Sequence, residues 1–456
     1  MIKAFPIFLT FCCTSFFFFP FFPAVLPTVN TKMIMAACGL VALCFELAKK
    51  GSGKISVDLL SLSVMAFTVS GASLLSMLIN DSRDNSYLMY FISMWVWLGA
   101  GYFMTWMIRW AHGKVSIELV CYYLIAVGAI QCIMAITGNL VPAFQNIKDS
   151  LMSNDTGFMG TGKGRLHGLG CALDVAGGRF AAILLMIAFL LPKATANTNN
   201  KLFWLLMTAY CIIAMIGNMI GRTCIVGVAL SIAYFIYVSS IGNVLPFYTK
   251  AVFSKRVFSF IALAFVLGVI LYNTNAQWQK NIRFGFEGPI SLYETGKWEV
   301  KSNDMLMDGY KWPDNLHTWI IGDGYMASTS VDAYYVGMNT DYWYAGTDAG
   351  YCRFIFYFGL VGMTAFSLFM LTATCICCRK FPNYSILFLS FFTLNMIVWV
   401  KVSTDLFLVF APFLCISRKD QKKYLLEQDE WEDEEYEEIE TQELEHQESK
   451  NSLCHI

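Results

Sequence analysis

Residues 257–273 read VFSFIALAFVLGVILYN and contain no charged side chain. Similar apolar runs recur along the chain, and a helix that crosses a bilayer needs about 20 largely apolar residues. We therefore predict an all-α polytopic membrane protein with about 12 transmembrane helices. The predicted spans are residues 4–26, 31–48, 57–79, 88–110, 116–137, 171–191, 202–220, 223–241, 257–273, 351–374, 384–400 and 402–416.

The composition agrees with this class. Hydrophobic residues make up 57% of the 456 residues and charged residues 14%, whereas soluble domains carry about 25% charged residues. Of 33 acidic and 32 basic residues, 14 and 5 lie in residues 417–456, which leaves 19 and 27 in residues 1–416. The sequence thus divides into a basic transmembrane domain, 1–416, and an acidic cytoplasmic tail, 417–456, which we expect to be disordered or loosely helical.

Lysine and arginine concentrate in short loops on the cytoplasmic side of membrane proteins. Here basic residues follow every second predicted span. They are Lys49, His112, Lys114, Lys193, Lys201, Lys250, Lys255, Arg256, Arg379, Lys380 and Arg418. This pattern predicts that both termini are cytoplasmic. It also places two long loops outside, at about residues 138–170 and 274–350, and the second is rich in Trp and Tyr. Such side chains stack on sugar rings, but they also form ordinary interfacial belts.

Four arginines break the positive-inside pattern, because they fall on the predicted outer side. They are Arg165, Arg179, Arg222 and Arg353, each in a different segment. Guanidinium groups keep their charge and match phosphate oxygens, so together they suit a diphosphate ligand. The alternative is that each one reaches the interface or pairs with a nearby acid, for example Arg179 with Asp174 or Arg353 with Asp348.

Two familiar kinds of site are not indicated. Residues 157–163 fit the GxxxxGK pattern, but Gly164 replaces the Ser or Thr of a nucleotide-binding loop. The five histidines never reach metal-ligand spacing, so we expect no metal site and no cofactor. Nothing in the sequence points to nucleic acid.

Three segments resemble the O-antigen polymerase (Wzy-type) and O-antigen ligase superfamily of bacterial polysaccharide assembly. The first is Arg165-Leu166-His167-Gly168 followed by residues 174–180, and the second is Gly221-Arg222-Thr223. The third runs from Trp319 to Tyr325, then from Thr347 through Asp348-Ala349-Gly350-Tyr351 to Gly362. The resemblance covers roughly residues 80–400. The ligase branch commonly has a His-Asn pair where this chain has Asp348-Ala349-Gly350-Tyr351, and this difference favours the polymerase.

The resemblance implies a metal-independent glycosyltransferase of the bacterial inner membrane. Its donor and acceptor would be polyprenyl-diphosphate-linked repeat units, joined on the extracytoplasmic face into O-antigen, capsule or exopolysaccharide. It further implies that the four arginines bind diphosphate. Asp348 is then the first choice for a catalytic base, with His317 and Asp323 behind it. Substrate contacts fall to Tyr351, Asp174 and Trp319.

The sequence is also compatible with two other functions. An O-antigen ligase would transfer the finished glycan to an outer-core lipid. A flippase or transporter of lipid-linked oligosaccharide also uses about twelve helices, although it has no obvious need for so long an exported loop. The expected partners are membrane lipid, a chain-length regulator and a flippase, the last two in the same membrane.

Overall fold

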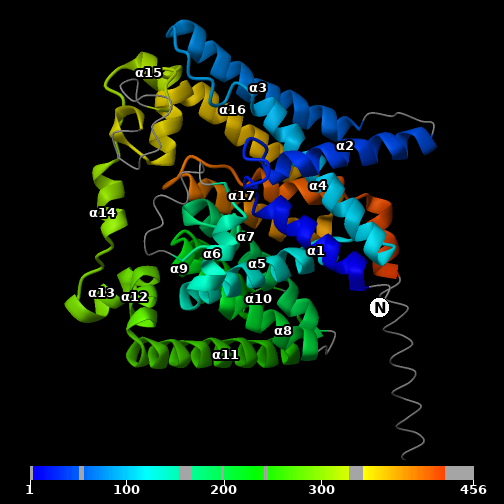
Figure 1. Ribbon diagram of the computed structural model, residues 1–456, viewed down its shortest axis with the longest axis vertical. Coiled ribbons are helices and arrows are strands. Elements are labelled where there is room, and N and C mark those ends of the chain that lie inside the picture. The colour runs from blue at the N-terminus through cyan, green and yellow to red at the C-terminus, as the bar shows by residue number, and fades with distance from the viewer. Residues whose placement is uncertain are drawn as a thin grey trace, which may run out of the picture.

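A computed structural model describes residues 4–50, 56–153, 166–196, 200–240, 242, 245–327 and 343–426. Within these ranges the chain forms helices and no strand, apart from two isolated β-bridges (Figure 1). The apolar helices are α1 (Ala4–Phe18), α2 (Thr31–Lys50), α3 (Val57–Ile79), α4 (Tyr90–His112), α5 (Ile117–Leu140), α7 (Leu173–Ala196), α8 (Asn200–Ile212), α9 (Asn218–Ile220), α10 (Cys224–Ser240), α11 (Phe247–Thr274), α16 (Gly350–Lys380), α17 (Ser385–Val398) and α18 (Phe407–Cys415).

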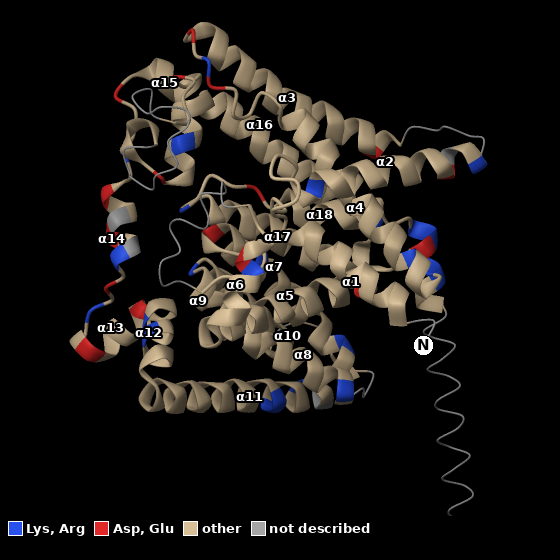
Figure 2. Cartoon of the chain, viewed as in Figure 1, with Lys and Arg blue, Asp and Glu red and all other residues tan. Residues whose placement is uncertain are grey.

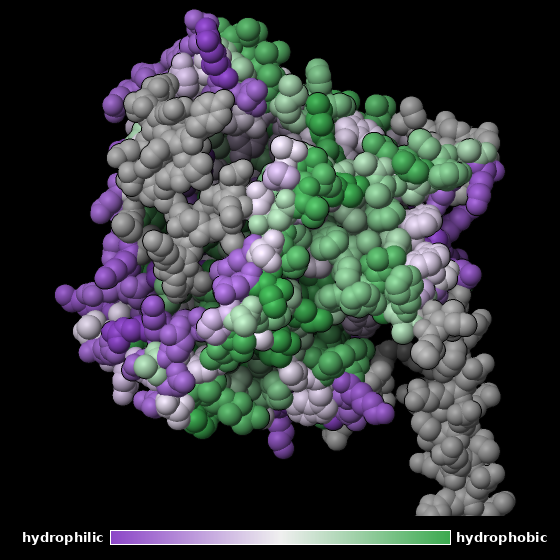
Figure 3. All heavy atoms as spheres, in the orientation of Figure 1, coloured by the Kyte–Doolittle hydropathy of each residue, from purple (hydrophilic) through white to green (hydrophobic). Residues whose placement is uncertain are grey.

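Seven helical segments of the described chain are long and apolar enough to cross a membrane. They are Val57–Ile79, Tyr90–His112, Ile117–Leu140, Leu173–Ala196, Asn200–Ile220, Thr249–Thr274 and Gly350–Lys380. Three shorter apolar helices accompany them, at Ala4–Phe18, Cys224–Ser240 and Pro382–Val398. A band of apolar side chains covers much of the visible face between more polar ends (Figure 3). The protein is a helical membrane protein, whereas the full set of about 12 spans stays a prediction.

Two predicted spans are shorter in the structure. The first helix ends at Phe18 rather than residue 26, because Pro20 and Pro23 lack the N–H that a continuing helix needs. Residues 402–416 yield only α18, Phe407–Cys415. A helix of this length covers about 14 Å, less than half the hydrocarbon thickness. Residues 399–406 form an irregular connection between α17 and α18.

The basic helix ends lie together. Arg109 at the end of α4 pairs with Glu46 of α2 and with Asp420, with N–O distances of 3.3 and 2.9 Å. Lys193 of α7 pairs with Glu118 of α5 at 3.3 Å, and Arg379 of α16 pairs with Asp58 of α3. Lys and Arg gather at these ends on the right of Figure 2. The opposite ends of α2, α7 and α16 therefore share the other side of the bundle.

Residues 418–426 continue as a helix that packs against this basic side. Gln421 is buried, and its side chain bonds the backbone N–H of Ile117 at 2.8 Å and Glu118 at 3.0 Å. The start of the predicted tail is thus part of the folded bundle. The acidic run from Glu427 onwards lies outside the described residues.

The two predicted outer loops contain further helices. Residues 138–170 include α6 (Pro142–Ser150), and residues 274–350 include α12 (Ala276–Gly285), α13 (Glu287–Thr295), α14 (Lys301–Asp308) and α15 (Leu316–Ile320). In Figure 1, α12 to α15 lie along one side of the molecule, away from the N-terminus. This part carries the exposed aromatic residues Tyr293, Trp298 and Trp312.

The predicted orientation can be tested with reporter fusions. A green fluorescent protein fused after Ile456 should fluoresce, and alkaline phosphatase fused after Glu299 should be active, because one folds in the cytoplasm and the other outside it. A dark fluorescent fusion together with inactive phosphatase would contradict the predicted topology.

Candidate functional site

The candidate site begins with a break in α16. Phe358 and Gly359 have non-helical dihedral angles, and Gly359 has φ 63°. Next to this break, the carbonyl oxygens of Phe356 and Tyr357 accept hydrogen bonds from the backbone N–H groups of Asp323 and Gly324, at 2.6 and 3.0 Å. The Gly322-Asp323-Gly324 segment and the break in α16 therefore hold each other.

The end of α3 and the loop after it complete this junction. Ser76 donates to the Tyr357 carbonyl at 2.7 Å, and Asn80 donates to the Gly322 carbonyl at 2.9 Å. Asp84 accepts from the backbone N–H groups of Met326 and Ala327 at 2.7 and 3.2 Å. Backbone that leaves a helix at membrane depth needs such partners, since lipid supplies none.

A second irregular segment, residues 399–406, faces the start of α16. The backbone N–H of Tyr351 donates to the Trp399 carbonyl at 3.0 Å, and the Tyr351 hydroxyl donates to the Met396 carbonyl at 2.9 Å. Asn395, fully buried, accepts the backbone N–H of Leu406 at 2.9 Å. These bonds position Asp405, which is partly buried beside α7.

Arg179 and Lys32 lie near Asp405 and interact with its charge. Both also line a cavity of about 210 Å³ together with Asn30, Trp97, His167 and Val175. Among the described residues, no Asp or Glu lines this cavity. Since α2 and α7 end on the basic side, their first two turns, which hold Lys32 and Arg179, lie towards the opposite, predicted outer side.

Arg179 is a buried cation in the lining of this cavity. Its side chain is only 8% exposed, and it lies over the ring of Phe19 with its guanidinium carbon 5.9 Å from the centroid. Within the described residues it forms no ion pair, and its Nε has no hydrogen-bond partner. Asp405 interacts with its charge but forms no ion pair with it within the described residues, and burying an incompletely paired charge is costly. An anionic ligand in the cavity would relieve this cost.

Arg353 is a second buried arginine, in the first turn of α16. It is 8% exposed, and its guanidinium carbon lies 3.5 Å from the ring centroid of Trp343. Tyr87 interacts electrostatically with both Asp405 and Arg353, and its hydroxyl bonds the Ser403 carbonyl at 3.1 Å. The described structure contains no ion pair between Arg353 and Asp348.

Arg222 already has an anionic partner. Its Nη1 lies 2.8 Å from Oε2 of Glu287, and its guanidinium stacks on Phe284 at 4.2 Å. Asp174 does not pair with Arg179 but with Lys401, at 2.9 Å, and it also accepts a hydrogen bond from Thr223 at 2.7 Å. These contacts join the turn at residues 221–223 to α7 and to the 399–406 segment.

The remaining predicted site residues are spread over the outer part. Asp348 and His317 are exposed. Asp323 accepts hydrogen bonds from Thr318 at 2.5 Å and Tyr344 at 3.1 Å, so its oxygens are used within the fold. Trp319 stacks on Trp312 with ring centroids 5.6 Å apart. Arg165, like residues 157–163, lies outside the described residues.

The surroundings of Asp323 also change the pKa of Tyr344. Loss of hydration, and then the charge of Asp323, raise the pKa of Tyr344 to about 12. Its hydroxyl therefore keeps its proton, and the hydrogen bond to Asp323 persists through neutral and mildly alkaline pH.

Lys32 and Asp405 belong to the site but were not among the predicted site residues. Both had a usable signal in the sequence. Lys32 opens an apolar run on the predicted outer side, where the positive-inside pattern disfavours cations. Asp405 interrupts an apolar stretch, and an ionisable residue in such a position is costly unless it has a role.

The fold and the site define a helical membrane protein with a buried cationic cluster. No protein-family model, no curated protein and no solved structure matches the chain. The resemblance to the polymerase and ligase superfamily thus rests on the three short segments alone.

The junction at α16 predicts a large effect for Gly359→Ala. A Cβ at Gly359 would lie 2.2 Å from the Ile320 carbonyl oxygen, and alanine also disfavours φ 63°. We expect a loss of about 2 kcal/mol or more in stability, measured by unfolding of the purified protein in detergent. Gly71→Ala in α3 is the control, since a Cβ there meets nothing within 4 Å. Equal stability of the two variants would contradict the described junction.

The Arg222–Glu287 pair predicts coupling between these positions. In a double-mutant cycle with Arg222→Ala and Glu287→Ala, we expect a coupling energy of about 1 kcal/mol or more, because both groups are largely buried. Unfolding of the four proteins under the same conditions measures it. Additive effects would show that the two side chains do not act as a pair.

Proposed function

We propose that the protein is a glycosyltransferase that polymerises polyprenyl-diphosphate-linked repeat units on the outer face of a bacterial inner membrane. The observation that carries this proposal is the cavity lined by Lys32 and Arg179, whose described lining residues include no acid. Arg179 is buried, and its Nε has no partner within the described chain. A diphosphate carries the charge and the acceptor oxygens that such a site lacks.

The chemistry follows from the leaving group. A sugar hydroxyl of the acceptor attacks the anomeric carbon of the donor glycan, and the bond from that carbon to the diphosphate oxygen breaks. Negative charge builds up on the departing polyprenyl diphosphate, where Arg179 and Lys32 stabilise it. The hydroxyl proton passes to a base. Asp348 is the candidate base, because it is exposed just before α16.

The outer segment supplies surfaces that suit glycan. Trp312 and Trp319 stack with nearly parallel rings, and Trp312, Trp298 and Tyr293 are 49%, 58% and 92% exposed. Exposed aromatic faces next to polar loops can pack against sugar rings while amides and carboxylates bind the hydroxyl groups. The same surfaces would serve the ligase function.

One observation favours a flippase as the second candidate. Both α16 and the α17–α18 pair are interrupted, and transporters often build their substrate sites from broken helices. The cationic cavity would then carry the diphosphate of the lipid across the membrane instead of stabilising it as a leaving group. The experiment below separates these functions.

The test is the size of surface glycan and of carrier-linked glycan in a strain that lacks the protein. We expect single repeat units instead of long chains. Long chains retained on the carrier would identify a ligase, and repeat units retained on the cytoplasmic leaflet would identify a flippase. Either result would overturn the proposed polymerase.

Complementation of that strain tests the cationic cluster. Arg179→Gln and Arg353→Ala should reduce long-chain glycan by about a hundredfold or more, since Arg179 lines the proposed diphosphate cavity and Arg353 is the second buried arginine of the predicted diphosphate-binding set. Arg283→Ala is the matched control, because Arg283 forms an exposed ion pair with Glu294. Immunoblots of membranes verify equal protein levels. Normal chain length in both cluster variants would contradict the assignment of this site.

A further inference from the structure

A second feature lies on the opposite, basic side of the bundle. Helix α11 is long and apolar, yet only 6% of its most apolar stretch is buried. Near its start, Phe253 and Val257 are buried against the bundle, and Phe253 contacts Phe235 of α10 with ring centroids 5.9 Å apart. Further along, Leu263 and Phe265 are 53% and 73% exposed. In Figure 1, α11 lies along the lower edge of the molecule.

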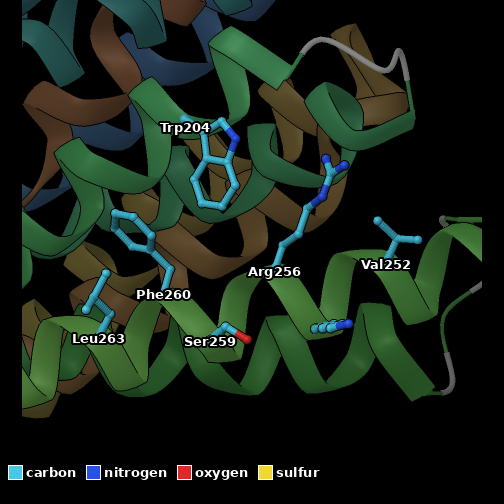
Figure 4. Close-up of a pocket in the computed structure, with 7 residues that line it drawn as sticks. Trp204, Val252, Arg256, Ser259, Phe260 and Leu263 are labelled. Atoms are coloured by element: carbon cyan, nitrogen blue, oxygen red, sulfur yellow. The ribbon is translucent and has the colours of Figure 1, made fainter.

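A groove of about 500 Å³ separates α11 from α8. Figure 4 shows Trp204 of α8 pointing towards α11, with Phe260 and Leu263 at one end of the groove and Arg256 and Val252 towards the other. Trp204 and Phe260 are in contact, with ring centroids 5.6 Å apart. Lys255 and Ser259 complete the lining.

The lining changes from charged to apolar along α11. Lys255, Ser259 and Leu263 follow one another at intervals of four residues, so they lie on one helical face over about 12 Å. This order matches a lipid that places its phosphate near the membrane surface and its acyl chain deeper. Trp204, at the same level as Phe260, is a residue type that favours the interface.

The charge around the groove is positive throughout. The sequence contains no acidic residue between Asp174 and Glu287, so α8, α10 and α11 contribute none. Arg256 is held by the side chain of Asn200, with a distance of 2.8 Å from Nη1 to Oδ1. The described residues offer Lys255 no ion-pair partner. A zwitterionic headgroup would leave these two charges uncompensated, whereas an anionic one neutralises them.

We propose that this groove binds an anionic phospholipid of the leaflet on the basic side. Lys255, Arg256 and Ser259 hold the headgroup phosphate, and Trp204, Phe260 and Leu263 contact the acyl chain. The site is separate from the cationic cavity at Arg179, and it does not depend on the proposed glycosyltransferase activity.

The test measures lipid binding to the purified full chain by native mass spectrometry. Phosphatidylglycerol should bind more tightly than phosphatidylcholine, and Lys255→Ala/Arg256→Ala should weaken phosphatidylglycerol binding about tenfold or more. Lys419→Ala/Lys422→Ala is the matched control, because it removes two exposed cations from the same side of the bundle at another place. This control should retain the binding of the unaltered protein.

A second variant tests the groove without altering charge. Ser259→Trp fills the space between the charged and apolar ends and should also reduce phosphatidylglycerol binding. Equal affinity for the two lipids, or equal affinity in Lys255→Ala/Arg256→Ala and its control, would overturn the proposal. A dimer that Ser259→Trp abolishes while lipid binding stays unchanged would assign the groove to a second copy of the chain, and would overturn it as well.

Discussion

Backbone groups that leave a helix inside a membrane must find partners within the protein, because lipid offers none. Two interruptions, at Phe358–Gly359 and at residues 399–406, impose this requirement here. The backbone of Asp323 and Gly324 satisfies the carbonyl groups next to the first. At the second interruption, the Asn395 side chain accepts the backbone N–H of Leu406, and the backbone N–H of Tyr351 donates to the Trp399 carbonyl. These partners tie segments far apart in the sequence into one assembly, on which the candidate site depends.

The same assembly also brings the buried charged side chains of the candidate site together. Asp405 lies on the second irregular segment, where it faces Lys32 and Arg179, and Tyr87 lies close enough to interact with both Asp405 and Arg353. One carboxylate thus interacts with two cations, and Arg353 interacts with the same tyrosine as that carboxylate. The interaction of Asp405 with both Lys32 and Arg179 differs from the pairs Arg222–Glu287 and Lys401–Asp174, in each of which one cation meets one acid and fastens neighbouring segments.

Periodic and compositional signals in the sequence were enough to predict a helical membrane protein and the start of most apolar helices. They also placed Arg179, which the structure brings near Asp405, among the candidate site residues. They did not reveal the break in α16. A Phe-Gly pair inside an apolar run, such as Phe358-Gly359, also occurs in continuous membrane helices, where glycine lets neighbouring helices pack closely. Only the approach of Ile320 and the dihedral angles of Gly359 show it. The pairing of Asp174 with Lys401 joins residues that no local pattern relates.

We propose that the cavity at Lys32 and Arg179 binds a diphosphate, and the affinity of the purified protein for lipid phosphates is the measurement to make. We predict that a polyprenyl diphosphate binds more tightly than the corresponding monophosphate and that inorganic diphosphate competes with it. Arg179→Gln should weaken this binding about tenfold or more, while Lys255→Ala/Arg256→Ala should leave it unchanged. Equal affinity for the diphosphate and the monophosphate, or unchanged affinity in Arg179→Gln, would show that this cavity is not a diphosphate site.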